Sequence, residues 1–124
     1  MAKVLIVDDE KDICEITSFL FESNGHETAV AYDTQEGLGK VESFAPDLVI
    51  SDIRMPGGGG IHLLEEIQKM EEGKPVVFLI TGYADITKED ALKKGAADIF
   101  SKPIKLQEIY SRVMSVTNLA STSR

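Results

Sequence analysis

The sequence predicts a single-domain α/β protein in which helices cover both faces of a parallel sheet. The chain has 124 residues, enough for one hydrophobic core. Its short apolar runs are continuous rather than alternating, which is typical of strands buried on both faces. Segments with helical periodicity separate these runs. Regular alternation of strands and helices favours parallel strands joined by right-handed crossovers.

Five segments are predicted to be strands. The apolar runs are Val4–Val7, Leu48–Ile50, Val76–Ile80 and the weaker pair Ile99–Phe100. The segment Glu27–Ala31 is less apolar, and we expect it to be an edge strand.

A helix is predicted after each strand. In the first, Ile13, Ile16 and Leu20 recur at helical spacing and are expected to face the core. Asp33 followed by Glu36 is typical of a capped helix start, and this helix is expected to run to about Ser43. The remaining helices are predicted around Leu64, Ile67 and Met70, over Thr87–Lys94, and along Leu106, Ile109, Val113 and Val116, while Gly25 and Gly95 are expected to end helices.

Composition excludes several classes of protein. With 13 basic and 21 acidic side chains the net charge is −8, which argues against direct nucleic-acid binding. One cysteine, Cys14, cannot form an internal disulfide, and we expect it in the core or at its flank. No apolar run approaches the length of a membrane span and the first residues do not resemble a signal peptide, so we expect a cytoplasmic protein. His26 and His62 lie in no ligand pattern and are expected at the surface.

Polar side chains capable of chemistry follow the predicted strands where each one ends. Asp8 and Asp9 follow the first strand, and Asp52 follows the third. Thr81 and Lys102 follow the fourth and fifth. Because ligands of open parallel sheets bind beyond the carboxyl ends of the strands, we expect these groups to form one site.

Three converging carboxylates repel one another, and a fold tolerates them only if a cation binds or protons are retained. At a separation of ~5 Å and an effective dielectric of ~20, each pair of charges costs about 3 kcal/mol. Hard oxygen ligands with room for water favour Mg²⁺. A divalent metal, a carboxylate, a hydroxyl and an ammonium together suit a phosphoryl group, with Asp52 as the nucleophile that becomes an aspartyl phosphate. The alternative for Asp9 is a helix cap, for Thr81 a hydrogen bond within its own turn, and for Lys102 a solvated charge.

The motifs VDDE, SDIRMPGGGG, ITGYA and SKP stand in this order, and in their spacing the chain resembles the response-regulator receiver domains of two-component signalling. The resemblance spans residues 3 to 118 and implies a flavodoxin-like (βα)5 fold, with strand order 2-1-3-4-5. It places the receiver domain at residues 1–118, and we expect residues 119–124 to be a tail or the start of a linker.

The resemblance also assigns roles to residues. Asp9 and Asp52 would coordinate Mg²⁺ directly, Asp8 would act mainly through water, and the main-chain carbonyl of Arg54 would be a further ligand. Thr81 would hydrogen-bond a phosphoryl oxygen and Lys102 would pair with it. The bond between Lys102 and Pro103 would be cis.

A protein of this family accepts a phosphoryl group from a sensor histidine kinase or a histidine phosphotransfer protein. The resemblance therefore implies a phosphoacceptor switch, not an enzyme with an external substrate, although the domain catalyses its own phosphorylation and dephosphorylation. Phosphorylation would switch the interactions of the face formed by the fourth helix, fifth strand and fifth helix. The output partner or domain is unknown, and a homodimer is one possibility.

Two features depart from the family pattern. The family carries an aromatic residue three positions before the lysine, where this chain has Ile99, and strand alternation turns Phe100 to the other face. The four glycines Gly57–Gly60 replace a loop that usually has one well-placed glycine, and we expect an unusually mobile loop. They do not form a phosphate-binding loop, because the lysine of that motif is absent.

Two other functions fit these residues less well than a receiver does. A phosphatase of the haloacid-dehalogenase type needs an acid two residues after its nucleophile, where this chain has Arg54. A flavodoxin-like cofactor carrier needs a first loop rich in Ser, Thr and Gly, whereas Asp8, Asp9 and Glu10 would repel a phosphate. The receiver interpretation is therefore favoured.

Overall fold

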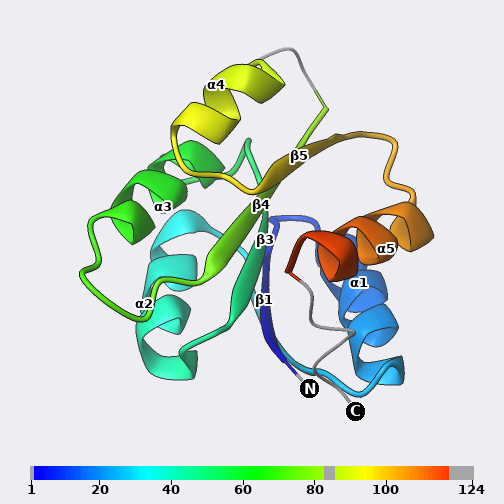
Figure 1. Cartoon of the computed structure of the whole chain (residues 1–124). Helices are drawn as coiled ribbons and strands as arrows, with labels where there is room; N and C mark the ends of the chain where they lie inside the picture. Colours follow the sequence, from blue (N-terminus) through cyan, green and yellow to red (C-terminus); the bar gives the residue numbers. More distant parts are fainter. Residues whose placement is uncertain (1, 83–85, 118–124) are drawn as a thin grey trace.

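The computed structural model describes residues 2–82 and 86–117, in which five parallel strands alternate with five helices (Figure 1). The strand order is β2-β1-β3-β4-β5, which confirms the predicted flavodoxin-like topology. The elements are β1 (Lys3–Val7), α1 (Lys11–Ser23), β2 (Glu27–Ala31), α2 (Thr34–Phe44), β3 (Leu48–Asp52), α3 (Gly59–Gln68), β4 (Val76–Thr81), α4 (Lys88–Lys93), β5 (Asp98–Ser101) and α5 (Leu106–Thr117).

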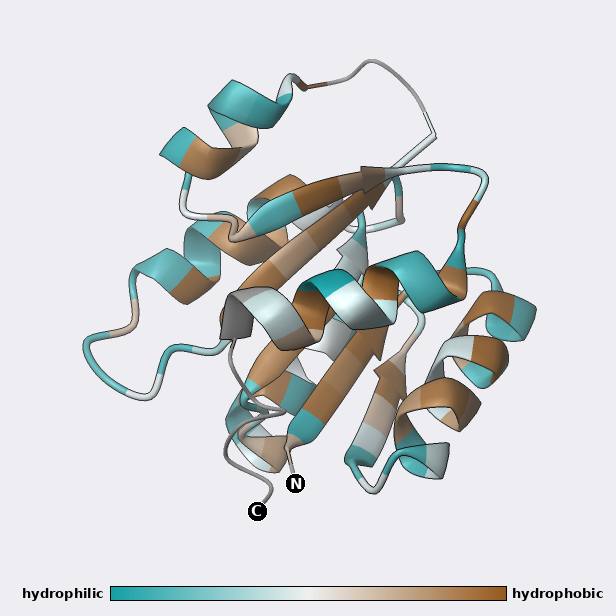
Figure 2. Ribbon diagram, turned by 45° about the vertical axis from the view of Figure 1, so that its right-hand side comes forward, coloured by the Kyte–Doolittle hydropathy of each residue, from teal (hydrophilic) through white to brown (hydrophobic). Residues whose placement is uncertain are grey.

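Helices cover the sheet on both faces. Val4 and Ile6 of β1 pack in the core beneath α1 and α5, while Leu5 and Val7 pack in the core beneath α2, α3 and α4. The central strands are largely brown, for hydrophobic residues, whereas the helices combine brown and teal residues (Figure 2). No helix in the described part of the chain is long and apolar enough to cross a membrane.

Helix boundaries follow local hydrogen bonding. Asp33 caps α2 by accepting a hydrogen bond from the Glu36 amide at 2.8 Å, as the sequence predicts. Thr87 caps α4 in the same way, accepting from the Asp90 amide at 3.0 Å. Gly25, which follows α1 and its C-cap residue, has φ +88°, a conformation that glycine adopts at little cost.

The buried face of α1 differs from the prediction. The predicted stripe included Ile16, but this side chain is 50% exposed, and Phe19 is 72% exposed. The helix has apolar residues around much of its circumference, so periodicity alone does not identify the face that the sheet covers. The buried residues of α1 are Cys14, Thr17 and Phe21.

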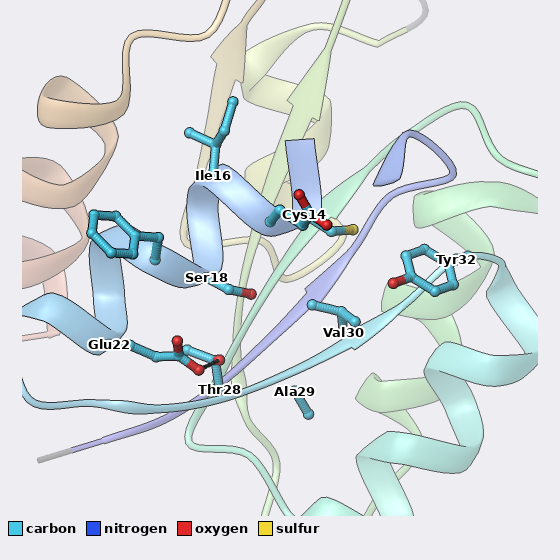
Figure 3. Close-up of a pocket in the computed structure, with 10 residues that line it drawn as sticks. Cys14, Ile16, Ser18, Glu22, Thr28, Ala29, Val30 and Tyr32 are labelled. Carbon is cyan, nitrogen blue, oxygen red and sulfur yellow. Dashed lines mark hydrogen bonds between the residues drawn. The ribbon is translucent and has the colours of Figure 1, made fainter. Parts of the chain in front are cut away.

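The exposed side of α1 borders a hollow of about 720 Å³ between this helix and the edge strand β2 (Figure 3). Ile16 and Phe19 of α1 line it on one side, and Val30 of β2 lines the other. Cys14 also lines it but is itself fully buried, as the sequence predicts.

His26 is buried, so the prediction of a surface histidine is wrong. Its Nδ1 accepts a hydrogen bond from the Ala2 amide at 3.0 Å, and its Nε2 lies 3.3 Å from the Tyr110 hydroxyl of α5. Because Nδ1 is an acceptor, the neutral ring carries its proton on Nε2, which donates to Tyr110. The ring also packs against Phe21, so one side chain joins the start of β1 to α1 and α5.

These contacts predict a pH-dependent stability. Burial lowers the pKa of His26, so the unfolded chain binds the proton more readily than the folded one. The stabilisation from neutral His26 is complete above its unfolded pKa of about 6.5 and decreases as the pH falls below that value. We expect the free energy of unfolding to fall further between about pH 7.5 and about pH 5.5 in the parent than in His26→Asn, which retains an acceptor but does not titrate. Urea denaturation at the two pH values measures this difference. Equal changes in both proteins would contradict this role of His26.

Candidate functional site

The parallel register brings four strand ends to one edge of the sheet. Val7 of β1 is level with Ser51 of β3, so Asp8 and Asp52 follow side by side. Thr81 of β4 is level with Ser101 of β5, so Lys102 extends beyond the end of the sheet. Strand ends far apart in the sequence thus meet, as the sequence predicts.

Three carboxylates gather at this edge. One oxygen of each of Asp8, Asp9 and Asp52 lies within 4.8 Å of the others. Asp8 and Asp52 are buried, at 2% and 4% exposed, while Asp9 faces solvent. Buried like charges repel strongly, so the cluster has the donor type and the electrostatic need for a hard divalent cation.

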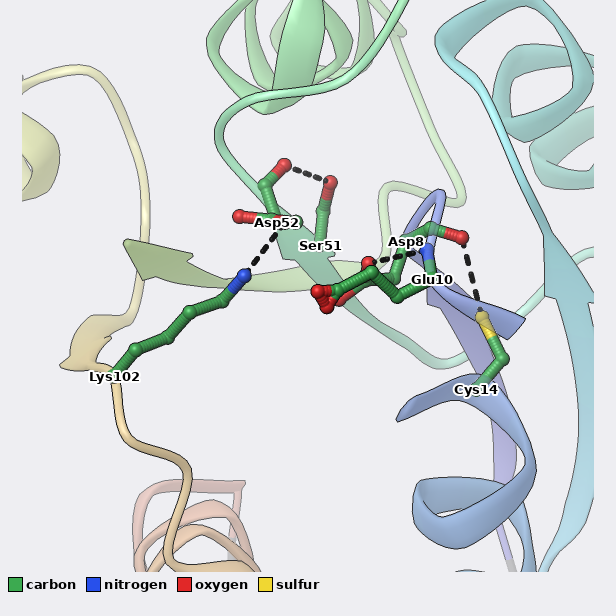
Figure 4. A network of polar contacts seen from close by, with 6 residues as sticks. All are labelled: Asp8, Glu10, Cys14, Ser51, Asp52 and Lys102. Carbon is green, nitrogen blue, oxygen red and sulfur yellow. Dashed lines mark hydrogen bonds and ion pairs between the residues drawn. The ribbon is translucent and has the colours of Figure 1, made fainter. Parts of the chain in front are cut away.

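Asp8 is fixed by its surroundings (Figure 4). Its Oδ1 accepts a hydrogen bond from the Glu10 amide at 2.9 Å, and its main-chain carbonyl accepts one from the Cys14 thiol at 3.3 Å. Burial, reinforced by the charge of Asp52, raises the pKa of Asp8 to about 6. The carboxylate is held in place at an electrostatic cost.

Lys102 supplies a positive charge to the cluster. Its Nζ lies 3.1 Å from Oδ2 of Asp52 (Figure 4). Burial opposes the charged form of Lys102, but the hydrogen bond and attraction from Asp52 outweigh burial and raise its pKa. Its amide also donates to the Thr81 carbonyl at 2.8 Å. The Lys102–Pro103 bond is cis, which confirms the expectation from the resemblance.

The competing interpretation of Asp9 as a helix cap is not supported. The N-cap residue of α1 is Glu10, and no side chain caps this helix. Asp9 therefore lies at the carboxylate cluster without a capping role.

Thr81 and Arg54 complete the predicted set. Thr81 is the last residue of β4 and is 8% exposed, one position beyond the level of Asp52. Arg54 follows β3 with its side chain exposed. The role of its main-chain carbonyl as a ligand stays a prediction.

Sequence reasoning missed two supporting residues. The Ser51 hydroxyl, fully buried, donates to the main-chain carbonyl of Asp52 at 2.9 Å (Figure 4). The Cys14 thiol supports Asp8 from α1. Cys14 belongs to no motif, and Ser51, the first residue of SDIRMPGGGG, is assigned no role by the resemblance. The one available signal was the position of Ser51 directly before a candidate nucleophile.

The predicted orientation of the Ile99 position is confirmed. Ile99 packs against the core beneath α2, α3 and α4, whereas Phe100 packs on the opposite face and stacks on Phe78 with ring centroids 6.1 Å apart. No aromatic side chain therefore takes the place of Ile99 from the next position of β5.

Comparisons with known proteins agree with this geometry. The family model described as response regulator receiver domain matches residues 4–114. A receiver domain of the Francisella response regulator 1452 is 32% identical, with 97% of this chain and 99% of that chain covered and a TM-score of 0.85. A receiver domain protein from Clostridium thermocellum is 31% identical over 100% of both chains, with a TM-score of 0.86.

A longer protein is also similar. NtrX from Brucella abortus, solved in complex with ATP, is 32% identical with a TM-score of 0.83; the match covers 99% of this chain and 28% of that one. Topology, the acidic cluster beside Lys102 and the family match across nearly the whole chain lead to one assignment. The chain belongs to the response regulator receiver domain family of two-component signalling.

Proposed function

We propose that Asp52 accepts a phosphoryl group from the phosphohistidine of a sensor histidine kinase or histidine phosphotransfer protein. The observation that carries this proposal is the buried Asp52 carboxylate, which lies in the acidic cluster and pairs with Lys102 at 3.1 Å. A buried carboxylate that was merely structural would not need two further carboxylates beside it.

The acidic cluster fits Mg²⁺. Asp9 and Asp52 would hold the ion directly, Asp8 through water, and Arg54 through its main-chain carbonyl. When bound, Mg²⁺ supplies positive charge that offsets the carboxylates and the incoming phosphoryl oxygens.

The residues of the chain then carry the transfer. An Asp52 oxygen forms a bond to phosphorus while the bond from phosphorus to the donor imidazole nitrogen breaks, and that nitrogen retains the bonding electron pair. The Lys102 ammonium and the Thr81 hydroxyl would bind the transferred phosphoryl oxygens. Because the Lys102 ammonium already lies beside Asp52, its side chain needs little rearrangement to contact the transferred phosphoryl group.

The signal would leave through α4, β5 and α5. Asp98, at the start of β5, lies 2.6 Å from Nε of Arg112 on α5 and 3.5 Å from Nζ of Lys88, the first residue of α4. Lys102 lies just beyond the other end of this strand. β5 is thus connected to the candidate site at one end and to both helices at the other.

The proposed context is a cytoplasmic switch that acts without contacting nucleic acid or membrane directly. In this proposal the switch receives its phosphoryl group from a kinase or phosphotransfer protein and acts on an output partner or domain, either as a monomer or as a homodimer. NtrX extends well beyond the matched region, which supports an output domain joined to a receiver of this type. Residues 1–118 would form the receiver domain, and residues 119–124 would form a tail or the start of a linker. Residue 118 and the whole tail lie outside the described part of the chain.

Phosphorylation is expected at Asp52 alone. Incubation with acetyl phosphate and Mg²⁺ should add one base-labile phosphate, measured by intact mass. Asp52→Asn should slow the incorporation by at least about 100-fold, equivalent to about 2.7 kcal/mol of barrier, because the amide is not a competent nucleophile. Asp12→Asn, which changes an exposed carboxylate of α1, should behave as the parent. Incorporation into Asp52→Asn at the parent rate would exclude this acceptor.

Mg²⁺ is expected to stabilise the fold. At ~100 times the dissociation constant it should add about 2.7 kcal/mol to the free energy of unfolding. Asp9→Asn should raise the stability of the metal-free protein, because it removes one repelling charge, and should greatly reduce the response to Mg²⁺. Thermal denaturation with and without Mg²⁺ measures both effects. A melting temperature of the parent that millimolar Mg²⁺ leaves unchanged would refute the metal site.

The switch is expected to depend on Thr81 rather than on a rotating aromatic ring. On binding beryllofluoride, a phosphoryl analogue, the largest changes should fall between Thr81 and Lys94, with the Ile99 side chain nearly unmoved. Methyl NMR spectra compare Ile99 with Ile86 directly, and both side chains pack against the same core. Equal shifts at the two methyl groups would contradict this mechanism.

A further inference from the structure

A buried threonine of α2 contacts the loop that follows Asp52. Thr34, the first residue of α2, is fully buried. Its Oγ1 accepts a hydrogen bond from the Gly59 amide at 2.9 Å, and its own amide donates to the Pro56 carbonyl at 3.1 Å. These two bonds hold the loop on both sides of Gly57 and Gly58.

This stretch of chain, the glycine loop (Gly57–Gly60), has a path that few other residues could follow. Gly57, Gly58 and Gly59 have φ values of +90°, +114° and +79°. A Cβ on Gly59 would collide with the Ile53 carbonyl oxygen. The run of glycines is therefore a requirement of the path, whereas the mobility expected from the sequence stays a prediction.

Glycines give the loop no side chains with which to hold itself in place. They also lose the most conformational freedom when ordered, so the path needs contacts from outside the loop. One contact comes from the sheet, because the Ile53 amide donates to the Ile80 carbonyl at 2.9 Å. The Gly60 amide closes the loop onto the Ile53 carbonyl at 2.9 Å. Thr34 supplies the contacts from α2.

Arg54 lies between two of these fixed points. On one side Ile53 is bonded to β4, and on the other Pro56 is bonded to Thr34. The position of the Arg54 carbonyl thus depends on how firmly the glycine loop is held. The Thr34 hydroxyl contacts Gly59, accepting a hydrogen bond from its amide at 2.9 Å and donating one to its carbonyl at 3.4 Å.

We propose that Thr34 is a positioning residue whose hydroxyl, by holding the Gly59 amide, keeps the loop after Asp52 in the conformation that binds a divalent cation. The inference deepens the proposed function and rests on its metal site. Without the hydroxyl, the buried Gly59 amide loses its partner, and the main-chain hydrogen bonds from Thr34 to Pro56 and from Gly60 to Ile53 are left to hold the loop. The path that presents Arg54 is held less firmly. The loop must then become ordered when the ion binds, which lowers the apparent affinity for the ion.

The test uses Thr34→Val, which removes the hydroxyl at nearly constant shape, and Thr34→Ser, which retains it. Mg²⁺ alone is titrated into each protein by calorimetry. Thr34→Val should raise the dissociation constant about tenfold, or about 1.4 kcal/mol, while Thr34→Ser should stay near the parent. Hydrogen exchange at the Gly59 amide of the metal-free protein should become faster in Thr34→Val and be restored in Thr34→Ser.

A matched control separates positioning from general loss of stability. Val41→Ala truncates a buried side chain of the same helix, so it should destabilise the fold and leave the affinity for Mg²⁺ unchanged. In phosphorylation by acetyl phosphate, Thr34→Val should raise the half-saturating Mg²⁺ concentration and leave the rate at saturating Mg²⁺ within about twofold. If Thr34→Val does not fold, Thr34→Cys, a weaker acceptor of similar size, replaces it.

The outcomes distinguish this inference from the proposed function. Equal Mg²⁺ affinities in the parent and Thr34→Val would overturn the role of Thr34, even with Asp52 phosphorylated normally. A parallel loss of affinity in Val41→Ala would also overturn it. Failure of the parent to take up phosphate at saturating Mg²⁺ would instead overturn the proposed function, and the calorimetric comparison would still decide the role of Thr34 in metal binding.

Discussion

Repulsion among Asp8, Asp9 and Asp52 is the constraint around which the carboxyl edge of the sheet is arranged. Separate strands bring these carboxylates within 4.8 Å of one another, and two of the three are buried. Because water cannot screen buried charges well, the fold must hold them in place and supply positive charge. Hydrogen bonds from the Glu10 amide to Asp8 and from Lys102 to Asp52 meet part of this need. The remainder is the electrostatic basis of the proposal that this edge binds a cation and then a phosphoryl group.

The two sides of this arrangement are held differently by the rest of the structure. The central strands β1 and β3 are buried almost throughout, so the registers that align Asp8 with Asp52 are firmly fixed. Lys102, by contrast, follows the short edge strand β5, whose other end is joined through Asp98 to α4 and α5. In the proposed switch, these polar contacts of Asp98 would link a change in the pairing of Lys102 to the two helices.

Much of the fold and of the site could be predicted from the sequence, because both depend on local signals. Continuous apolar runs identified four of the five strands, and the polar residues after these runs identified the edge of the sheet where Asp52 and Lys102 pair. Features that depend on tertiary packing were less accessible. The buried face of α1 was misplaced because Ile16 and Phe19 are apolar yet exposed. His26 and Thr34 acquire their roles from partners far away in the sequence, Tyr110 and Gly59, which no local pattern indicates.

The central claim is that the acidic cluster, Thr81 and Lys102 form one phosphoryl-binding site on Asp52. A crystal structure of the protein grown with Mg²⁺ and beryllofluoride tests it most directly. The account predicts beryllofluoride on an Asp52 carboxylate oxygen, in contact with Thr81 and Lys102, and Mg²⁺ bound by Asp9, Asp52 and the Arg54 carbonyl. Beryllofluoride on another carboxylate, or Mg²⁺ held away from Asp52, would contradict it.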